Sequence, residues 1–533
     1  MSDPSPLSDR EPELLEREVA LSQSLIWSRQ REFYQQRGLR AWTEDRIPNF
    51  VTSNPFIADI YAHMVAAFLA DCLGGASHAP PSAENPVRIL ELGAGTGKFA
   101  CLFLRRVTAL LAANNIAPEM VHYCMSDCSP GLIESWKQNR YLAEFVARGM
   151  LEFDLFEAGR QLSPGFLGAA KSQSAPLVVV ANYVFDSLPN DAFVARDGEI
   201  SEYVLTTRAP AAPATRSGDS ELADSHPLAR LLFTYSSIKI SHDRFRDPLW
   251  GRILQQYRAV SGATVLFPSA ALRLLQQISQ FAQGPQLFLL ADKGYVHPED
   301  LPQGPPTLEF HSDNCFSQMV NFDALAKYFQ ATDGLALVPQ KHSAILSLCA
   351  FLRGVDSDRL PATRAAYRES QEAFGPDDLF ALLAWLNAHM EEISVSQALA
   401  VLRLTHWDPI ALLRLFPVLA RQLRGITSER LDMRNAVLKV WANHFPITPD
   451  EDLLAFDCGA ILLELGFPDD ALPMFQASQQ ILGPSAATSY NLALCCQGLR
   501  RNPEALIYAK DACDLDPASQ PARLLLQKLS SAS

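Results

Sequence analysis

A glycine-rich turn constrains this chain more than any other feature of its sequence. Residues 87–92 (VRILEL) have the pattern of a buried strand, residues 93–97 follow as GAGTG, and a helix pattern begins at Lys98. Three glycines in five residues let the backbone turn sharply, approach a ligand closely and pack the next helix on the sheet. The segment therefore predicts the first βα turn of a nucleotide-type binding domain.

The spacing of this turn separates two kinds of ligand. Dinucleotide enzymes use Gly-x-Gly-x-x-Gly and place a pyrophosphate at the helix N-terminus. Here the glycines recur at every second position, and an acid precedes the turn. A carboxylate is a poor neighbour for pyrophosphate but a good one for the cationic amino group of S-adenosylmethionine (SAM), so we expect SAM rather than NAD. A tight turn without a ligand is the remaining alternative. The expected cofactor-binding residues of this turn are Glu91, Gly93, Ala94, Gly95, Thr96 and Gly97.

Acidic side chains follow the next two expected strands. Asp127 comes directly after residues 121–126, where a ribose needs a bidentate acceptor. The alternative for Asp127 is capping the next helix, a role that Ser129 could also take. Asp154 follows a short strand at residues 150–153 and could accept a hydrogen bond from the adenine amino group. A solvated surface acid is the alternative for Asp154.

A polar segment follows the buried strand at residues 176–181, which contains three consecutive valines. Open α/β sheets bind ligands beyond the carboxyl ends of their strands. We therefore expect Asn182 and Asp186 to face the reacting methyl group, where they could hold a nucleophile or accept its proton, with Tyr183 shaping the acceptor pocket. Asn182 also belongs to the expected cofactor site. The alternative for Asn182 and Asp186 is turn formation.

Strand and helix patterns alternate through the first two thirds of the chain. This alternation is typical of a doubly wound, parallel sheet with helices on both faces. Besides the segments named above, we expect helices at residues 98–114, 130–139 and 269–283 and a strand at 286–292, with segments 322–329 and 343–352 closing the region.

The segments around this core have patterns of their own. We expect disorder to about residue 12, one helix over residues 13–36, and a second over 55–72 that Asn54 caps with Pro55 at its first position. Pro- and Ser-rich composition predicts a linker at residues 78–86 and a flexible insertion at 208–227.

The C-terminal third is rich in Leu and Ala and has helix patterns only, beyond about residue 360. Small or apolar residues recur there with an offset of 34 residues, which is the tetratricopeptide period. Two units are clear, and helices over residues 377–444 are expected to continue the stack. The matching residues are Gly459, Ala471 and Phe475 in one unit and Ala493, Ala505 and Ala509 in the next.

Composition excludes several classes of protein. A net charge of −14 argues against binding to nucleic acid. The ten cysteines have no zinc-type spacing, and His297 and His311 are expected in loops or at the surface rather than as metal ligands. No signal sequence, transit peptide or apolar run of about 18 residues was identified, so we expect a cytoplasmic protein without a membrane span.

Several segments in order resemble the MidA-like family of SAM-dependent methyltransferases, whose members include a mitochondrial complex I assembly factor that methylates a protein arginine. The resemblance covers roughly residues 25 to 350. It implies a methyltransferase fold and SAM as cofactor, with Phe50, Thr52 and Ser53 on the substrate side. The segments that carry it are residues 49–53 (NFVTS), 91–97 (ELGAGTG), 127–130 (DCSP), 182–189 (NYVFDSLP), 292–295 (DKGY) and 320–325 (VNFDAL).

Two residues depart from the pattern of this family. Tyr183 stands where the family has a glutamate, and Asn49 stands where it has an aspartate. Because both changes remove negative charge, the resemblance implies methyl transfer more firmly than it implies an arginine acceptor.

We therefore predict an α/β, Rossmann-like class I methyltransferase domain followed by an all-α, tetratricopeptide-like repeat domain. The expected acceptor is a protein side chain, and the repeats are expected to recruit the substrate or a partner. A small-molecule acceptor with repeats that serve a homodimer, and a non-catalytic scaffold, are the alternatives. The expected parts are residues 1–80 (helical segment), 81–352 (SAM-binding domain), 360–450 (helical region) and 451–533 (repeats).

Overall fold

A computed structural model describes most of the chain in two compact units. The first unit comprises residues 1–53 and 60–377, and the second comprises residues 54–59 and 378–533. The predicted N-terminal disorder, part of the predicted linker and most of the predicted insertion lie outside the described residues. The described residues are 11–44, 47, 49–76, 80–157, 174–210, 227–241, 244–341, 345–424 and 426–531.

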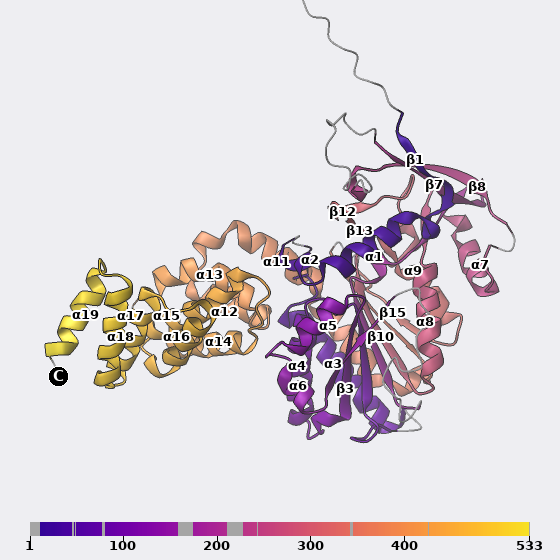
Figure 1. The fold of residues 1–533 in the computed structure, drawn as a ribbon. Helices are drawn as coiled ribbons and strands as arrows, with labels where there is room; N and C mark the ends of the chain where they lie inside the picture. Colours follow the sequence, from indigo (N-terminus) through magenta and orange to yellow (C-terminus); the bar gives the residue numbers. More distant parts are fainter. Residues whose placement is uncertain are drawn as a thin grey trace, which may run out of the picture. The chain divides into compact units, whose positions relative to one another are not determined.

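A seven-stranded sheet forms the centre of the first unit (Figure 1). Its order is β15-β16-β10-β5-β2-β3-β4. The five strands from β10 to β4 are parallel, and β16 runs antiparallel to both of its neighbours. The five strands predicted in this region are confirmed as β2 (Val87–Leu92), β3 (Val121–Asp127), β4 (Leu151–Leu155), β5 (Leu177–Asn182) and β10 (Gln286–Asp292). The other two strands are β15 (Leu335–Leu337), which was not predicted, and β16 (Ser347–Arg353), which lies in the segment expected to close the region.

Helices cover both faces of this sheet, with α4 and α5 on one side and α8 and α9 on the other (Figure 1). On the face covered by α8 and α9, Phe329 of α9 stacks on Phe351 of β16 with ring centroids 4.8 Å apart. Such burial of large apolar rings supplies much of the stabilisation of a core. The helices of this unit are α1 (Leu25–Arg37), α2 (Arg40–Thr43), α3 (Pro55–Asp71), α4 (Lys98–Ala113), α5 (Pro130–Lys137), α6 (Ala143–Ala147), α7 (Pro248–Gln255), α8 (Ser269–Phe281), α9 (Phe322–Gln330) and α10 (Pro361–Arg368).

A second, antiparallel sheet adjoins the first (Figure 1). Its order is β1-β7-β6-β9, and β8 also pairs with β7, along residues 201–208. The sequence did not indicate this sheet, because its strands are separated by a helix and by long connections. The strands are β1 (Glu13–Ala20), β6 (Asp191–Arg196), β7 (Glu199–Ala209), β8 (Leu232–Lys239) and β9 (Thr264–Phe267).

The single helix predicted over residues 13–36 is wrong in its first third. Residues 13–20 pair with β7 as β1, and α1 begins only at Leu25. The carboxylate of Glu16 explains the break, because it accepts hydrogen bonds from Leu25 N (2.6 Å) and Ser24 Oγ (2.7 Å) at the helix start. Pairing with β7 and this capping contact together outweigh the helix propensity of residues 13–20.

Helix α3 begins as predicted, because Asn54 Oδ1 accepts a hydrogen bond from Ile57 N (3.0 Å) and Pro55 is its first residue. The expectation that no apolar stretch is long enough to cross a bilayer is wrong. Residues 55–75 form a helical segment of 21 residues that is long and apolar enough to do so, judged by length and composition only. Of the most apolar window, 72% is buried inside the protein, as in a core helix.

The second unit is helical, as predicted, and the chain that the structure describes after Arg353 contains no strand. Residues from 393 to 529 contribute to one apolar core. A Cβ on Gly459 of α15 would lie 2.9 Å from the Phe475 ring of α16, so the glycine allows these two helices to approach closely. The helices are α11 (Pro376–Ala388), α12 (Val395–Leu404), α13 (Pro409–Gln422), α14 (Arg430–Ala442), α15 (Leu454–Glu464), α16 (Pro468–Leu482), α17 (Ala486–Gly498), α18 (Asn502–Leu515) and α19 (Gln520–Ser531).

Candidate active site

A pocket of about 650 Å³ lies in the first unit, at the carboxyl ends of β2, β3 and β5. Its size and its position beyond the parallel strands are typical of ligand sites in α/β sheets. Of the residues predicted from the sequence, eleven line it. They are Phe50, Thr52, Ser53, Gly93, Ala94, Gly95, Thr96, Asp127, Asn182, Tyr183 and Asp186.

The glycine turn forms one wall of this pocket and needs its glycines. Gly93, Gly95 and Gly97 have φ values of +64°, +53° and +79°, a region that other residues enter only with strain. A Cβ on Gly93 would lie 2.8 Å from Cγ2 of Val184, so the turn also lacks room there for a side chain. Gly97 does not line the pocket and instead packs beneath the turn, where a Cβ would approach Met125 to 2.9 Å.

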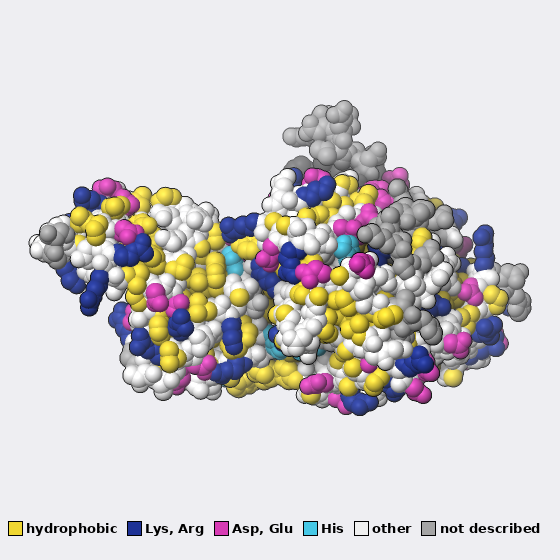
Figure 2. All heavy atoms as spheres, turned by 90° about the horizontal axis from the view of Figure 1, so that it is seen from below, with side chains coloured by type: hydrophobic (Ala, Val, Ile, Leu, Met, Phe, Trp, Pro, Cys, Tyr) yellow, Lys and Arg dark blue, Asp and Glu magenta, His cyan; other side chains and the backbone are white. Residues whose placement is uncertain are grey.

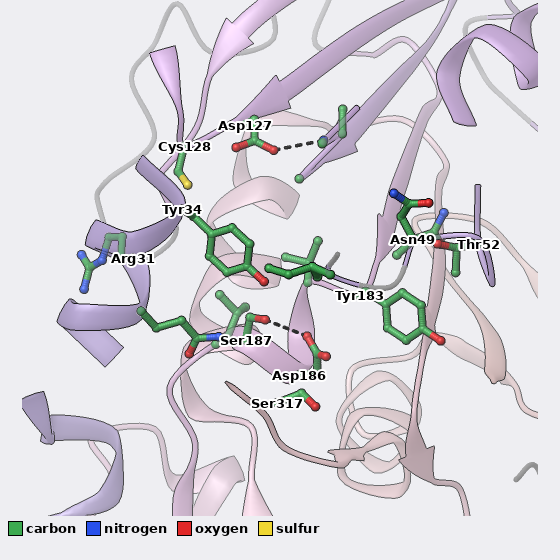
Figure 3. Close-up of a pocket in the computed structure, with 18 of the residues that line it drawn as sticks. Arg31, Tyr34, Asn49, Thr52, Asp127, Cys128, Tyr183, Asp186, Ser187 and Ser317 are labelled. Atoms are coloured by element: carbon green, nitrogen blue, oxygen red, sulfur yellow. Dashed lines mark hydrogen bonds between the residues drawn. The ribbon is translucent and has the colours of Figure 1, made fainter. Parts of the chain in front are cut away.

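Asp127 connects the turn to the end of β3. Its Oδ2 accepts a hydrogen bond from Gly95 N (3.1 Å) and its Oδ1 accepts one from Ser129 N (3.2 Å), as Figure 3 shows for the first contact. Burial raises the pKa of Asp127, and these bonds offset part of the rise. Ser129 occupies the N-cap position of α5, as the sequence allowed, but its side chain makes no capping hydrogen bond. Asp127 thus holds the start of α5 and also lines the pocket.

Glu91 is buried below the turn and does not line the pocket. Burial raises the pKa of its carboxyl to about 8, although the neighbouring Tyr123 hydroxyl lowers it in part. Its Oε2 has no hydrogen-bond partner among the described residues. An unpaired buried carboxyl is costly, and a cationic amino group placed nearby would stabilise its charged form. Because Glu91 is buried behind the pocket wall, its place beside the SAM amino group stays a prediction.

Asp154 is not brought to the pocket. Its Oδ1 accepts a hydrogen bond from the neighbouring Leu155 N (2.8 Å), and Asp154 is absent from the pocket wall. Phe156, two residues further on, lines the pocket instead. The predicted contact of Asp154 with the adenine is therefore not supported by the geometry, because Asp154 is not part of the pocket wall.

Asn182 ends β5 and is oriented by a buried tyrosine of α3. The Tyr61 hydroxyl donates a hydrogen bond of 2.6 Å to Oδ1 of Asn182. The Nδ2 atom of Asn182 is buried and has no hydrogen-bond partner in the described part of the chain. Asn182 as a residue lines the pocket.

Tyr183 and Asp186 follow on the same wall. Tyr183 has a φ of +54°, and its amide donates to Ala291 O (2.9 Å). Burial raises the pKa of Asp186 to about 7, and the Ser187 hydroxyl, which donates to Asp186 Oδ1 (2.9 Å; Figure 3), offsets part of this rise. Asp292 lies directly behind, where its Oδ2 accepts from Asp186 N (3.0 Å).

The segment before α3 closes another side of the pocket. Asn49, Phe50, Thr52 and Ser53 all line it, and Ser53 N donates to Asn49 O (2.9 Å) to form a compact turn. The side chains of Asn49 and Thr52 lie on the same side of the pocket as Tyr183 (Figure 3). The two residues that depart from the family pattern therefore line one cavity.

Two elements of the pocket were missed by the sequence analysis. Tyr34 of α1 extends into the middle of the pocket (Figure 3), and its hydroxyl lies 3.1 Å from Cys315 Sγ. His311 and Ser317 come from a hairpin of β12 (Glu309–Ser312) and β13 (Cys315–Ser317), with His311 Nε2 2.8 Å from Ser317 Oγ. His311 was expected only in a loop or at the surface. The hairpin has no distinctive pattern, so only the tertiary structure brings it to the site.

Comparison with known proteins identifies the family. The model of the family described as "Putative S-adenosyl-L-methionine-dependent methyltransferase" matches residues 65–336, half of the chain. The chain belongs to this family. It is therefore a SAM-dependent methyltransferase, and the predictions of this activity and of SAM as cofactor are confirmed. No match was found among curated proteins.

Three solved structures show more distant likeness. Two are members of one superfamily and come from Burkholderia thailandensis. The first has 15% identity, a TM-score of 0.36 and coverage of 64% of this chain and 88% of its own. The second, bound to S-adenosyl-homocysteine, has 15% identity, a TM-score of 0.36 and coverage of 58% and 81%. The plantazolicin methyltransferase BpumL, in complex with S-adenosyl-homocysteine (SAH), has 11% identity, a TM-score of 0.25 and coverage of 62% and 99%. The family assignment rests on the matched family model rather than on these structures.

Proposed function

We propose that the first unit is a Rossmann-like class I methyltransferase domain with its catalytic site in the 650 Å³ pocket. The strand order carries this proposal. From β2 the chain proceeds through β3 to β4 at one edge, and then returns through β5 and β10 on the other side of β2. Ligands of open α/β sheets bind where the order reverses in this way, and the glycine turn and Asn182 both lie at that point.

Asn182, Asp186 and Tyr183 would position the acceptor. Bound SAM supplies a methyl group on a sulfonium, so the protein has chiefly to orient the acceptor and exclude water. Asn182 offers its Nδ2 group, Asp186 offers a carboxyl held by Ser187, and the Tyr183 ring limits the width of the pocket. Asp127 and Glu91 would hold the ribose and the amino group on the opposite side.

The acceptor in this proposal is a protein side chain, with the helical unit recruiting the protein. Paired helices with a 34-residue offset support a tetratricopeptide-like arrangement, because Gly459 and the buried Ala493 are both small enough for close helix approach. Apolar side chains are exposed across this unit, as the yellow atoms of Figure 2 show. Such side chains suit a binding surface for a partner. The larger ones are Leu382, Trp385, Leu404, Leu431, Leu453, Leu482, Ile507, Leu515 and Leu524.

The resemblance to MidA-like enzymes would imply an arginine acceptor, but the pocket does not favour it. Asn49 and Tyr183 are neutral and both line the cavity, so the two acids that would attract a guanidinium are missing. We therefore include the protein acceptor in the proposal and leave arginine out of it.

Incubation of the full-length protein with methyl-labelled SAM in a cell extract tests this proposal. We expect the label to appear on protein bands and to depend on Asn182. Label in the small-molecule fraction alone would replace the protein acceptor with a small molecule and leave methyl transfer intact.

A further inference from the structure

The contact between Tyr61 and Asn182 determines which hydrogen bond the site can offer. A side-chain amide has one oxygen, which accepts, and one nitrogen, which only donates. Tyr61 is completely buried and its hydroxyl occupies Asn182 Oδ1 at 2.6 Å. The Nδ2 group, without a partner among the described residues, is the part of Asn182 left for a ligand. At this point the pocket therefore presents a donor.

A cationic acceptor does not match this donor. Guanidinium and ammonium groups carry donors and no lone pair, so neither can accept a hydrogen bond from Asn182 Nδ2. Binding either group would leave a buried donor unpaired, which is unfavourable. A group with oxygen lone pairs satisfies it directly.

The charged residues of the pocket point to the same class of acceptor. Among the described residues that line it, Arg31, Arg273 and Lys293 are cationic, and Asp127 and Asp186 are acidic. Asp127 already accepts two backbone hydrogen bonds, and Asp186 already accepts one from Ser187. Lys293 is already paired with Glu309 (3.0 Å), whereas no ion pair joins Arg31 or Arg273 to a carboxylate in the part of the chain that the structure describes. A carboxylate would complement both the two arginines and the Asn182 donor.

We propose that the methyl acceptor is a carboxylate whose oxygen accepts a hydrogen bond from Asn182 Nδ2, and that Tyr61 is a positioning residue that fixes this amide. The inference rests on the proposed function of the pocket. In the reaction one carboxylate oxygen forms a bond to the methyl carbon while the bond from that carbon to sulfur breaks, and its electron pair stays on sulfur. The products are a methyl ester and SAH, and no proton is released.

The chemical stability of the transferred label tests the acceptor class. Methyl esters hydrolyse in mild alkali and release volatile methanol, whereas methyl groups on nitrogen stay attached. After reaction of the full-length protein with methyl-labelled SAM in a cell extract, we expect most of the transferred label to become volatile at alkaline pH. Label that survives alkali would overturn the carboxylate acceptor while leaving methyl transfer in place. Absence of any transferred label would overturn the proposed function itself.

Tyr61→Phe tests the positioning role, because it removes only the hydroxyl that occupies Asn182 Oδ1. We expect turnover to fall on the order of tenfold while SAH affinity changes less than about twofold. Tyr367→Phe is the matched control, because it removes another buried hydroxyl that donates to a backbone oxygen, Leu348 O (3.0 Å), outside the pocket. Its turnover should match that of the wild type.

Asn182→Asp supplies a second variant of nearly equal shape. It replaces the donor with an ionisable oxygen, which would repel a carboxylate acceptor. We expect a larger loss of ester formation than in Tyr61→Phe, again with SAH bound. Full turnover in Tyr61→Phe, or ester formation preserved in Asn182→Asp, would overturn the proposal.

Discussion

The indole of Trp42 lies so close to Gly95 that a Cβ on the glycine would approach Cζ2 of the ring to 3.1 Å. The short helix α2 therefore packs directly on the glycine turn, and the chain before α3 belongs to the cofactor pocket. Trp136 fixes the other side of the turn, because its Nε1 donates to Gly95 O (2.9 Å). The turn is thus held between two indoles.

Gly95→Ala tests this arrangement. A side chain there meets both the left-handed backbone strain and the Trp42 ring, so we expect unfolding free energy to fall by about 1–2 kcal/mol or more and SAH affinity to fall. Gly198→Ala is the matched control, because Gly198 has a φ of +76° and a Cβ added to it would have no atom within 4 Å. The control should lose stability without losing affinity. Equal SAH affinity in Gly95→Ala and the wild type, by isothermal titration calorimetry, would contradict the contact.

The raised pKa of Glu91, about 8, predicts a pH dependence of SAH binding. Below this pKa the free protein holds a neutral carboxyl, and binding of a cationic amino group favours the ionised form. Binding should therefore release a proton, and affinity should rise as pH increases from about 5.5 to 7.5, where an α-amino group stays largely cationic. In Glu91→Gln the affinity should be lower and independent of pH. A flat wild-type profile in this range would show that Glu91 does not contact the amino group.

The titration of Asp186 predicts that turnover falls as pH rises, whereas SAH affinity is expected to rise. Its pKa is raised to about 7 by burial, so it is neutral below that pH and charged above it. A charged Asp186 would repel a carboxylate acceptor in the same pocket, so kcat/KM should fall above pH 7 and Asp186→Asn should flatten the profile. A rise through pH 7 that Asp186→Asn abolishes would instead mean that Asp186 removes a proton from the acceptor.

Gly459→Ala tests the close approach of α15 and α16. Alanine normally stabilises a helix relative to glycine by up to about 1 kcal/mol. The new Cβ would lie 2.9 Å from the Phe475 ring, so we expect a net loss of about 1–3 kcal/mol in the helical unit. Gly251→Ala in α7 is the control, because no atom lies within 4 Å of the added carbon, and it should be neutral or stabilising. Denaturant unfolding compares the two, and a stabilised Gly459→Ala variant would disprove the tight packing.

Local sequence patterns were sufficient to predict the parallel sheet and the glycine turn. Strands buried on both faces read as continuous apolar runs, and a turn that requires positive φ at Gly93, Gly95 and Gly97 requires glycine. The carboxyl ends of such strands meet at one edge, so Asp127, Asn182 and Asp186 could be placed together before the fold was known.

Long-range contacts account for what the sequence did not predict. Residues 13–20 have a helix-like pattern, but they pair with β7, nearly 190 residues further along the chain. Tyr34, His311 and Ser317 reach the pocket from segments without a distinctive motif. The Tyr61 contact to Asn182 likewise joins residues 121 positions apart. Such contacts depend on packing, and neither periodicity nor motif spacing records them.

Titration of the folded, full-length protein with SAM tests the central claim most directly. The wild type should bind with micromolar affinity at the glycine turn, and the Gly93→Arg/Gly95→Arg variant should lose binding, because arginine side chains would fill the space between the turn, Val184 and Trp42. Circular dichroism of both proteins would show that each is folded. A well-folded wild type that does not bind SAM, or a folded variant that binds it equally well, would contradict the account.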